Sequence, residues 1–202
     1  NMFKTPDEKL LIIDFGSQLT QLIARRFREL NVYCEIHPFN ISEKLIKKLQ
    51  PKGIIFSGGP ASVTVTAGPK ADEGILRLGV PILGICYGQQ TICEQLGGKV
   101  ESSEHKEFGR AELRITDDCV LFSGLWKIGE TQQVWMSHGD SVVELPDGFR
   151  SVAVSDHAPH AVIADDVRKF YAVQFHPEVM HTVGGKDLLR NFTHRVAGCA
   201  GD

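Results

Sequence analysis

The sequence lacks the features that would place it among membrane, secreted or nucleic-acid-binding proteins. No apolar run approaches the roughly 20 residues of a membrane-spanning helix. The net charge of −3 leaves no excess of Lys and Arg to bind nucleic acid or an acidic membrane surface. The five cysteines are odd in number and contain no Cys-x-x-Cys pair, which argues against a disulfide framework and a zinc ribbon. We therefore expect a cytoplasmic protein with no nucleic-acid or membrane partner.

What the sequence does contain is an ordinary globular composition, with 42% hydrophobic and 23% charged residues in 202. We expect a single domain over residues 2–198. In the first half, apolar runs typical of strands alternate with helical patterns. The predicted strands are 10–14, 32–36, 53–56 and 81–85, and the predicted helices are 18–30, 42–49, 71–78 and 89–96. This alternation predicts a parallel sheet covered by helices on both faces.

The second half of the chain has a different pattern. Its short strand-like runs are separated by turn residues and are 111–115, 132–136, 151–154, 160–164 and 170–175. A closing helix follows Gly184-Gly185. The expected fold class is therefore α/β: an open, mostly parallel central sheet with helices on both faces, plus an antiparallel extension in the second half.

The stretch Gly84-Ile85-Cys86-Tyr87-Gly88 joins the fourth strand to the helix that follows it. A side chain lifted out of so sharp a turn needs neighbours without Cβ atoms, as in the elbows that present nucleophiles in hydrolases. The N-terminus of a helix also favours a thiolate. The alternative is that Cys86 is simply a small buried apolar residue, as we expect for the other four cysteines. This pentapeptide alone does not decide between the two.

Four segments follow predicted strands and are expected to meet at one edge of the sheet. They are 14–17, 57–60, 86–88 and 175–178. His176, 90 positions after Cys86, would then lie beside it. Glu178, two positions further on, is close enough to orient the imidazole of His176 and to stabilise its protonated form.

Two alternatives for these residues are weaker. A metal site built from His176, Glu178 and His181 lacks both the Pro-Cys-x-x-Cys partner of zinc deaminases and the His-Glu-x-x-His of metalloproteases, so no metal is expected. A phosphate cradle at 57–62 lacks the Gly-Lys-Ser/Thr of a P-loop. We expect instead a glycine turn whose backbone N–H groups face Cys86 and stabilise an oxyanion.

Taken together, these motifs resemble the class I (triad-type) glutamine amidotransferase family, over residues 11 to about 196. The superfamily is marked by 84–88 and by Phe175-His176-Pro177-Glu178. Four further stretches are typical of the branch that provides ammonia for the amination of xanthosine monophosphate. These are 14–18, 57–60, 134–140 and 176–182.

The resemblance implies a role for each matching residue. Cys86 would be the nucleophile, His176 the acid/base and Glu178 its orienting carboxylate. Gly59 and Tyr87 would donate backbone N–H groups to the oxyanion. The residues implied to contact the glutamine substrate are Gly58, Gln90 and the loop Ser137-His138-Gly139. Gln89 and Leu19 depart from the family pattern, which commonly has methionine and often tyrosine there, and are expected to affect only substrate packing.

The resemblance also implies a partner. This domain would need no cofactor, and ATP and Mg would act in a separate ATP pyrophosphatase (synthetase) domain. We expect the chain to be a piece of a longer protein rather than a separate glutaminase subunit. Two alternatives stay open: an amidotransferase serving anthranilate or carbamoyl phosphate synthesis, and a non-catalytic regulatory domain of the same fold.

Overall fold

The structure, a computed structural model, describes residues 7–60 and 67–201. Its strands are β1 (Lys9–Asp14), β2 (Tyr33–Pro38), β3 (Gly53–Phe56), β4 (Ile82–Ile85), β5 (Lys99–Ile115), β6 (Thr131–Glu144), β7 (Arg150–Ser155), β8 (Ala158–Asp165) and β9 (Phe170–Val173). Its α-helices are α1 (Thr20–Glu29), α2 (Glu43–Leu49), α3 (Tyr87–Gln95) and α4 (Gly185–Asn191). Shorter helical turns are η1 (Glu73–Arg77), η2 (Val120–Phe122) and η3 (Phe192–Val196), the last wound as a π-helix that continues α4.

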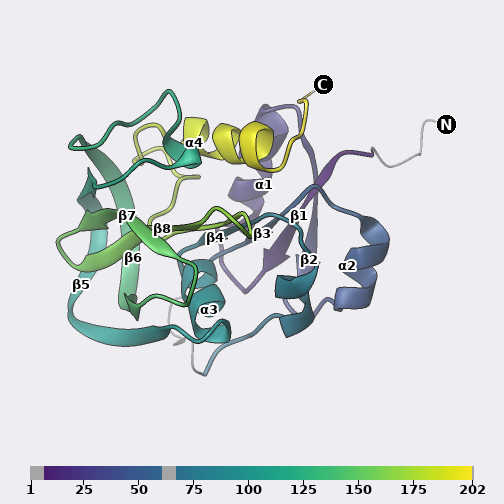
Figure 1. The fold of residues 1–202 in the computed structure, drawn as a ribbon, viewed down its shortest axis with the longest axis horizontal. Helices are drawn as coiled ribbons and strands as arrows, with labels where there is room; N and C mark the ends of the chain where they lie inside the picture. Colours follow the sequence, from purple (N-terminus) through teal and green to yellow (C-terminus); the bar gives the residue numbers. More distant parts are fainter. Residues whose placement is uncertain (1–6, 61–66, 202) are drawn as a thin grey trace.

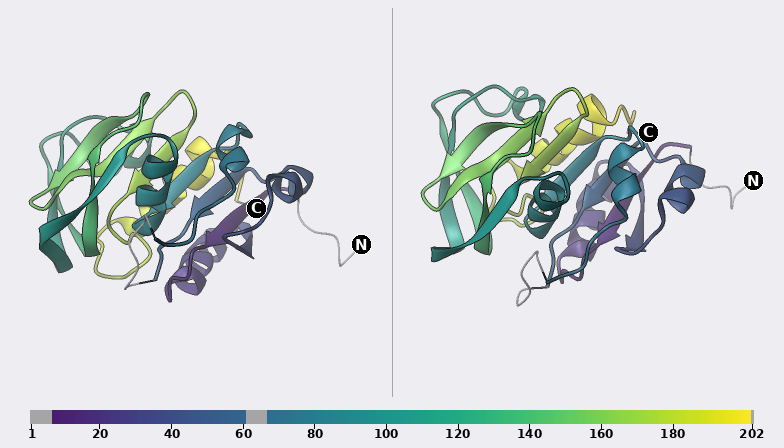
Figure 2. Two further views of the ribbon diagram at one scale, coloured as in Figure 1. Left: turned by 90° about the horizontal axis from the view of Figure 1, so that it is seen from below. Right: turned by 60° about the horizontal axis from the view of Figure 1, so that its bottom comes forward.

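All nine described strands join in one sheet, in the order β2-β1-β3-β4-β9-β8-β7-β5-β6. The strands from β2 to β9 in this order pair in parallel, and those beyond β9 pair antiparallel. Strand β9 is the junction, because it pairs parallel with β4 and antiparallel with β8. Figures 1 and 2 show the green antiparallel strands extending the sheet away from β1 and β2. The expected fold class, a mostly parallel sheet with an antiparallel extension, is confirmed.

Helices cover both faces of the parallel half, as the alternation of apolar residues in β1 requires. Leu10 and Ile12 pack on one face, in a core cluster that includes buried residues of α1 and α4. Leu11 and Ile13 pack on the other face, with buried residues of α2, η1 and α3. Figure 1 shows the first pair of helices above the sheet and the second group below it. In the described part of the chain, no helix is both long and apolar enough to cross a bilayer.

The sequence predicted the number of strands in the second half of the chain, but it underestimated the length of two of them. The runs 111–115 and 132–136 are only parts of β5 and β6, which are 17 and 14 residues long. The missed portions carry many polar and exposed residues, so no apolar alternation marked them as strands. As a result, Ser137-His138-Gly139, expected to be a loop, instead lies inside β6. That expectation was wrong because pairing with β5, not side-chain hydrophobicity, holds this stretch extended.

Strand β6 lies at the edge of the sheet, yet the segment after β9 is bonded to it. The backbone N–H of His176 donates to the carbonyl of Trp135 at 2.9 Å, and that of Val183 donates to the carbonyl of Gln133 at 3.0 Å. The antiparallel half therefore curls back toward the carboxyl end of β9. This curl brings β6 to the same end of the sheet as the loops that follow β1, β3 and β4.

The predicted N-terminus of the second helix is found at Ser42. Its backbone is extended, and its hydroxyl accepts a hydrogen bond from the N–H of Leu45 at 3.1 Å. This bond satisfies one of the four amide groups that a helix start leaves unpaired.

We predict that Ser42→Ala lowers the free energy of unfolding by about 1 kcal/mol, because the cap is lost while α2 keeps its core contacts. Denaturant titration measures the change. Lys44→Ala, an exposed position in the same helix, is the control and should change the free energy by less than about 0.5 kcal/mol. Equal effects of the two substitutions would contradict a capping role for Ser42.

Candidate active site

Cys86 occupies a strained position between β4 and α3. Its backbone has φ +56° and ψ −111°, a conformation that costs a non-glycine residue about 1–3 kcal/mol. Two sets of bonds hold it there: its N–H donates to the Val173 carbonyl of β9 at 2.8 Å, and its own carbonyl accepts from the N–H groups of Gln89 and Gln90. Helix α3 begins at the next residue, two residues earlier than predicted, because Cys86 alone makes the turn.

The two glycines that flank Cys86 allow α3 to approach the sheet closely. A Cβ at Gly88 would lie 2.2 Å from the carbonyl oxygen of Phe56 in β3, and a Cβ at Gly84 would lie 2.7 Å from Ile92. Neither position has room for a side chain. The glycine spacing therefore fixes how α3 sits on β3 and β4, and with it the direction in which Cys86 points.

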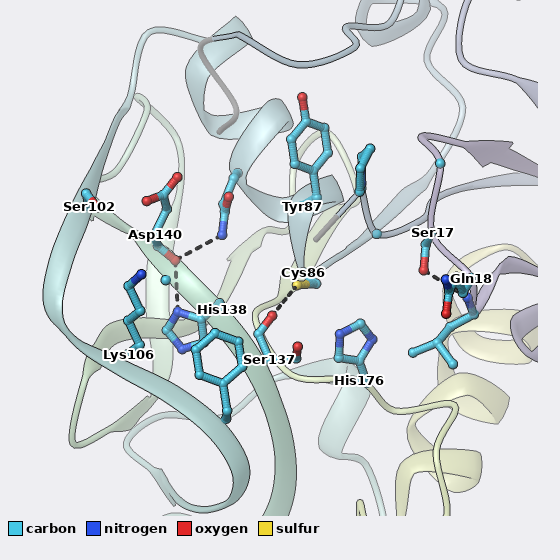
Figure 3. A pocket seen from close by; sticks show the side chains of 18 residues that line it. Ser17, Gln18, Cys86, Tyr87, Ser102, Lys106, Ser137, His138, Asp140 and His176 are labelled. Atoms are coloured by element: carbon cyan, nitrogen blue, oxygen red, sulfur yellow. Dashed lines mark hydrogen bonds between the residues drawn. The ribbon is translucent and has the colours of Figure 1, made fainter. Parts of the chain in front are cut away.

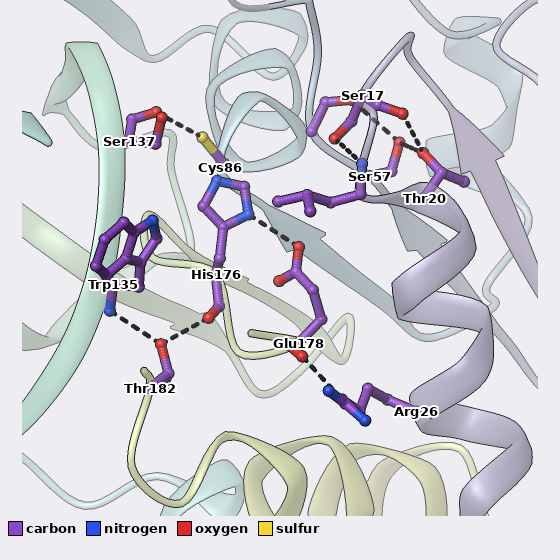
Figure 4. A network of polar contacts seen from close by, with 12 residues as sticks. Ser17, Thr20, Arg26, Ser57, Cys86, Trp135, Ser137, His176, Glu178 and Thr182 are labelled. Carbon is purple, nitrogen blue, oxygen red and sulfur yellow. Dashed lines mark hydrogen bonds and ion pairs between the residues drawn. The ribbon is translucent and has the colours of Figure 1, made fainter. Parts of the chain in front are cut away.

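The imidazole of His176 lies between Cys86 and Glu178 (Figure 4). The parallel register pairs Ile85 with Val173, so the residues after these two strands share one edge of the sheet. Nδ1 of His176 is 2.9 Å from Oε2 of Glu178, and the other side of the ring faces the Cys86 sulfur. All three side chains are buried. The structure thus brings together the three residues that the sequence predicted as a triad.

Burial and charge act in opposite directions on His176. Burial disfavours the charged imidazolium, but negative charge at Cys86, together with hydrogen bonds to Cys86 and Glu178, outweighs burial and holds the pKa of His176 well above its ordinary value. Glu178 is completely buried, and its second oxygen, Oε1, has no hydrogen-bond partner in the described structure. The imidazole is the cation that compensates this carboxylate.

The backbone around the His–Glu pair is held by side chains that were not predicted. The hydroxyl of Thr182 donates to the His176 carbonyl at 2.6 Å and accepts from the Trp135 N–H at 2.9 Å. Nε of Arg26 donates to the carbonyl of Glu178 at 2.8 Å. Arg26 thus reaches the site from α1 (Figure 4). Helical spacing alone does not show which loop packs beside α1.

The glycine turn after β3 borders Cys86, as expected. A Cβ at Gly59 would lie 2.5 Å from the ring of Tyr87, so the absence of a side chain lets this ring pack against the turn. The hydroxyl of Tyr87 donates to the carbonyl of Pro69 at 2.8 Å, and burial with the charge of Glu94 raises its pKa to about 12. No hydrogen bond among residues 7–60 and 67–201 uses the backbone N–H of Gly59 or Tyr87. Within these ranges, both amides remain available as donors.

A cleft of about 630 Å³ opens over Cys86 (Figure 3). Nine of the ten predicted site residues line it: Gly58, Gly59, Cys86, Tyr87, Gln90, Ser137, His138, Gly139 and His176. The tenth, Glu178, lies behind His176. Lining residues that were not predicted include Ser17, Gln18, Lys106 and Asp140. One cavity therefore collects side chains from both halves of the chain.

Two of the residues predicted to bind substrate are already engaged. Nε2 of Gln90 donates to the carbonyl of Asp140 at 3.0 Å and to Oε1 of Gln174 at 3.2 Å, so only its own carbonyl oxygen is left for a ligand. The carbonyl of Ser137 lies 3.6 Å from the Cys86 sulfur and accepts from its thiol.

His138 is held at both ring nitrogens. Nδ1 donates to the carbonyl of Asp140 at 2.8 Å (Figure 3). Nε2 lies 2.8 Å from Oε1 of Glu107. Burial alone would raise the pKa of Glu107, but hydrogen bonds from His138 and Ser155 outweigh it and lower that pKa. Both partners are hydrogen-bond acceptors, so His138 has no ring nitrogen free. Its ring therefore supports the wall of the cleft.

The structure places the two departures from the family pattern, Gln89 and Leu19, in different surroundings. Gln89 points away from the cleft, and its amide donates to the carbonyl of His160 at 2.9 Å, whereas Leu19 lines the cleft. His181, a candidate ligand in the metal alternative, packs its ring against Trp135 with a centroid distance of 4.8 Å. Within the described ranges, no three His, Cys, Asp or Glu side chains are grouped to hold a metal ion. The phosphate-cradle alternative partly falls on residues 61 and 62, which lie outside the described residues.

The residues that the prediction missed had weak signals. Gln174 is a lone amide in the otherwise apolar run Phe170–Phe175, just after β9 and two residues before His176. Thr182 lies within a stretch already noted for its similarity. Glu107 and Arg26 had no signal, because their partners are distant in sequence.

Comparison with known proteins agrees with this geometry. A sequence model of the family described as "Glutamine amidotransferase class-I" matches residues 11–196. The chain therefore belongs to the class I glutamine amidotransferase family.

Similar proteins within that family include GMP synthases. GMP synthase (glutamine-hydrolyzing) of Sinorhizobium fredii is 59% identical over 195 residues, which are 96% of this chain and 38% of that protein. The Rhodopseudomonas palustris protein of the same name is 60% identical, with 36% of its length covered. The chain thus spans little more than a third of the relatives it matches.

Solved structures agree on the fold. A Thermoplasma acidophilum protein, proposed to be one subunit of a GMP synthase, has a TM-score of 0.79 and 32% identity, with 92% of each chain covered. A glutamine amidotransferase of Thermotoga maritima has a TM-score of 0.74, with 96% of this chain and 99% of that one covered. At 19% identity, the second supports the fold alone.

The charge balance of the triad gives a prediction. In Glu178→Gln the amide still accepts from Nδ1 but carries no charge, so we expect the pKa of His176 to fall toward its ordinary value. NMR titration of the His176 ring measures it. Glu130→Gln is a control distant in sequence and should leave the midpoint unchanged. A His176 midpoint that is the same in Glu178→Gln and in the unmodified protein would refute the proposed ion pair.

Proposed function

We propose that this chain is a glutaminase domain that hydrolyses glutamine to glutamate and ammonia through a thioester on Cys86. The observation that carries the proposal is the alignment of the Cys86 sulfur, the His176 imidazole and the Glu178 carboxylate at the floor of a cleft. All three residues have the chemistry that nucleophilic attack on an amide requires.

In the first step the Cys86 thiolate attacks the side-chain amide carbon of glutamine, and the carbonyl π electrons move to oxygen. The N–H groups of Gly59 and Tyr87 stabilise this oxyanion, and the loss of one such donor lowers rates by on the order of 10²–10³. Protonated His176 gives its proton to the amide nitrogen, the C–N bond breaks and ammonia leaves. A thioester and a neutral imidazole remain.

In the second step His176 removes a proton from water, whose oxygen attacks the thioester carbon. The C–S bond breaks, its electron pair returns to sulfur, and glutamate is released. The thiolate and imidazolium are thereby restored. Glu178 stabilises the positive ring each time it forms, which matches the raised pKa of His176.

The surroundings of the cleft suit a small zwitterion. Lys106 and Asp140 place a cationic and an anionic side chain in its lining, beside polar side chains such as those of Ser17, Gln18 and Ser137. The contacts of Gly58, Gln90 and 137–139 with glutamine are part of this proposal.

We further propose that the ammonia is used to convert xanthosine monophosphate to GMP in an ATP- and Mg-dependent synthetase part that lies outside this chain. The identity of about 60% to GMP synthases over 96% of the chain supports this branch over anthranilate or carbamoyl phosphate synthesis. A docking partner is also supported by exposed apolar side chains. Phe108, which lines the cleft, is 68% exposed, and Met180 and Val183, in the segment that follows Glu178, are 86% and 53% exposed.

We predict that Cys86→Ala abolishes glutamate release, with a loss on the order of 10⁴-fold or more, because no other group can form the thioester. A coupled glutamate dehydrogenase assay measures the rate. Cys199→Ala, a buried cysteine outside the cleft, should keep the activity. Glutamate release by Cys86→Ala at the rate of the unmodified chain would exclude the thioester. An unmodified Cys86 after treatment with an electrophilic glutamine analogue would favour a regulatory domain.

We expect weak glutaminase activity from the chain alone, because a partner completes the site. Addition of the synthetase part of a GMP synthase, with ATP, Mg and xanthosine monophosphate, should raise kcat/KM on the order of tenfold. A synthetase component from the anthranilate branch is the matched control and should have no effect. Full turnover without any synthetase, unchanged when one is added, would overturn this part of the proposal.

A further inference from the structure

A second side chain, besides His176, approaches the Cys86 sulfur. Gln174 is 1% exposed and follows β9, where its backbone N–H donates to the carbonyl of Ala161 at 2.8 Å. Its side-chain Nε2 lies 3.6 Å from Sγ of Cys86, within hydrogen-bonding distance for sulfur. The carbonyl of Ser137 lies at the same distance from Sγ.

The orientation of the Gln174 amide is fixed by its neighbours. A backbone carbonyl can only accept, so the atom of Gln90 that contacts the Asp140 carbonyl must be its nitrogen. That same nitrogen contacts Gln174, whose facing atom must therefore be the oxygen. The nitrogen of Gln174 is consequently the atom that faces Cys86.

The position of the Asp140 carbonyl is fixed in turn. It also accepts from Nδ1 of His138, whose Nε2 is paired with Glu107. A continuous chain of hydrogen bonds thus runs from a buried carboxylate on β5 to the sulfur. Each member of this chain has one orientation that satisfies its neighbours, so the amide of Gln174 cannot turn over without leaving polar atoms unpaired.

The two contacts on sulfur favour different protonation states. The Ser137 carbonyl accepts a hydrogen bond only from the thiol, whereas the Gln174 N–H donates best to the thiolate. We propose that Gln174 is a catalytic residue, whose amide stabilises the Cys86 thiolate before attack and again when the C–S bond of the thioester breaks. Gln90 and the Asp140 carbonyl act through it as positioning groups. The inference rests on the proposed function only for the role of Cys86 as nucleophile.

Other charged groups around the sulfur are unchanged by substitution of Gln174. They are His176 with its partner Glu178, and Lys106, His138 and Asp140 in the cleft wall. The remaining described titratable neighbour, Tyr87, directs its hydroxyl away to Pro69. Substitution of Gln174 therefore changes the hydrogen bonding of the Cys86 sulfur and leaves the surrounding charged side chains in place.

The test is the pH profile of Cys86 alkylation by iodoacetamide in the full chain, read by mass spectrometry. The competing thiols are suppressed, because burial raises the pKa of Cys93 and Cys119 to about 12 and that of Cys199 to about 11. Burial also raises the pKa of Cys34. Cys86→Ala gives the remaining background.

Gln174→Met keeps the length of the side chain but has no N–H donor. We expect the alkylation midpoint to rise by about one pH unit. The more basic thiolate is also more nucleophilic, with a Brønsted coefficient of about 0.4–0.5, so the two profiles should cross. Below the midpoint the variant should react about threefold more slowly, and on the alkaline plateau about threefold faster. A purely structural role for Gln174 produces no such crossing.

The matched control is Gln89→Met, which replaces another buried glutamine whose amide bonds carbonyls of His160 and Ala172 and not the sulfur. Its profile should overlay that of the unmodified chain. Gln174→Glu, nearly isosteric, is a second variant in case Gln174→Met does not fold, and its negative charge should raise the midpoint further. A Gln174→Met or Gln174→Glu profile that overlays the unmodified one overturns the inference. Alkylation needs no glutamine, so this test and the glutamate-release test of the proposed function can fail separately.

Discussion

The interaction on which the rest of the site depends is the buried pair of His176 and Glu178 beside the Cys86 sulfur. A carboxylate that is fully buried and has one unpartnered oxygen needs a cationic partner, and the imidazole of His176, whose pKa is raised, lies 2.9 Å away. The fold meets this requirement with one strand pairing. Because β4 and β9 run parallel in register, residues 90 positions apart emerge at the same edge of the sheet. Everything else in the site adjusts the surroundings of these three groups.

The edge strand β6 contributes to the site mainly through hydrogen bonds to its backbone carbonyls. Three of its carbonyls each serve a different part of the site: Trp135 accepts from the His176 N–H, Ser137 faces the Cys86 sulfur, and Asp140 accepts from Gln90. Unpaired groups on an edge strand are ordinarily a liability for aggregation. Here the curl of the antiparallel half turns them inward, so the extension completes the site that the parallel half begins.

Two buried imidazole–carboxylate pairs border the cleft, and their difference explains their roles. Both nitrogens of His138 are engaged, with Glu107 and with the Asp140 carbonyl, so this ring is fixed as a support. His176 uses Nδ1 for Glu178 and turns the rest of its ring to the sulfur. Only the second ring has a nitrogen free to carry a proton between reacting atoms. The proposed assignment of acid/base chemistry to His176 therefore rests on its hydrogen bonds as much as on its position in a motif.

The sequence by itself determined the alternation of strands and helices, the glycine elbow and the grouping of loops at one sheet edge. These depend on local periodicity and on the rule that parallel strands end together. It also placed Cys86, His176 and Glu178 in one site, because each follows a strand of that sheet. Only the tertiary structure decided that 137–139 is a strand, that Arg26 and Thr182 hold the backbone of the triad, and that Gln174 meets the sulfur. Those contacts join residues far apart in the chain, and the curl that creates them is a property of packing and register, which local patterns of hydrophobicity do not encode.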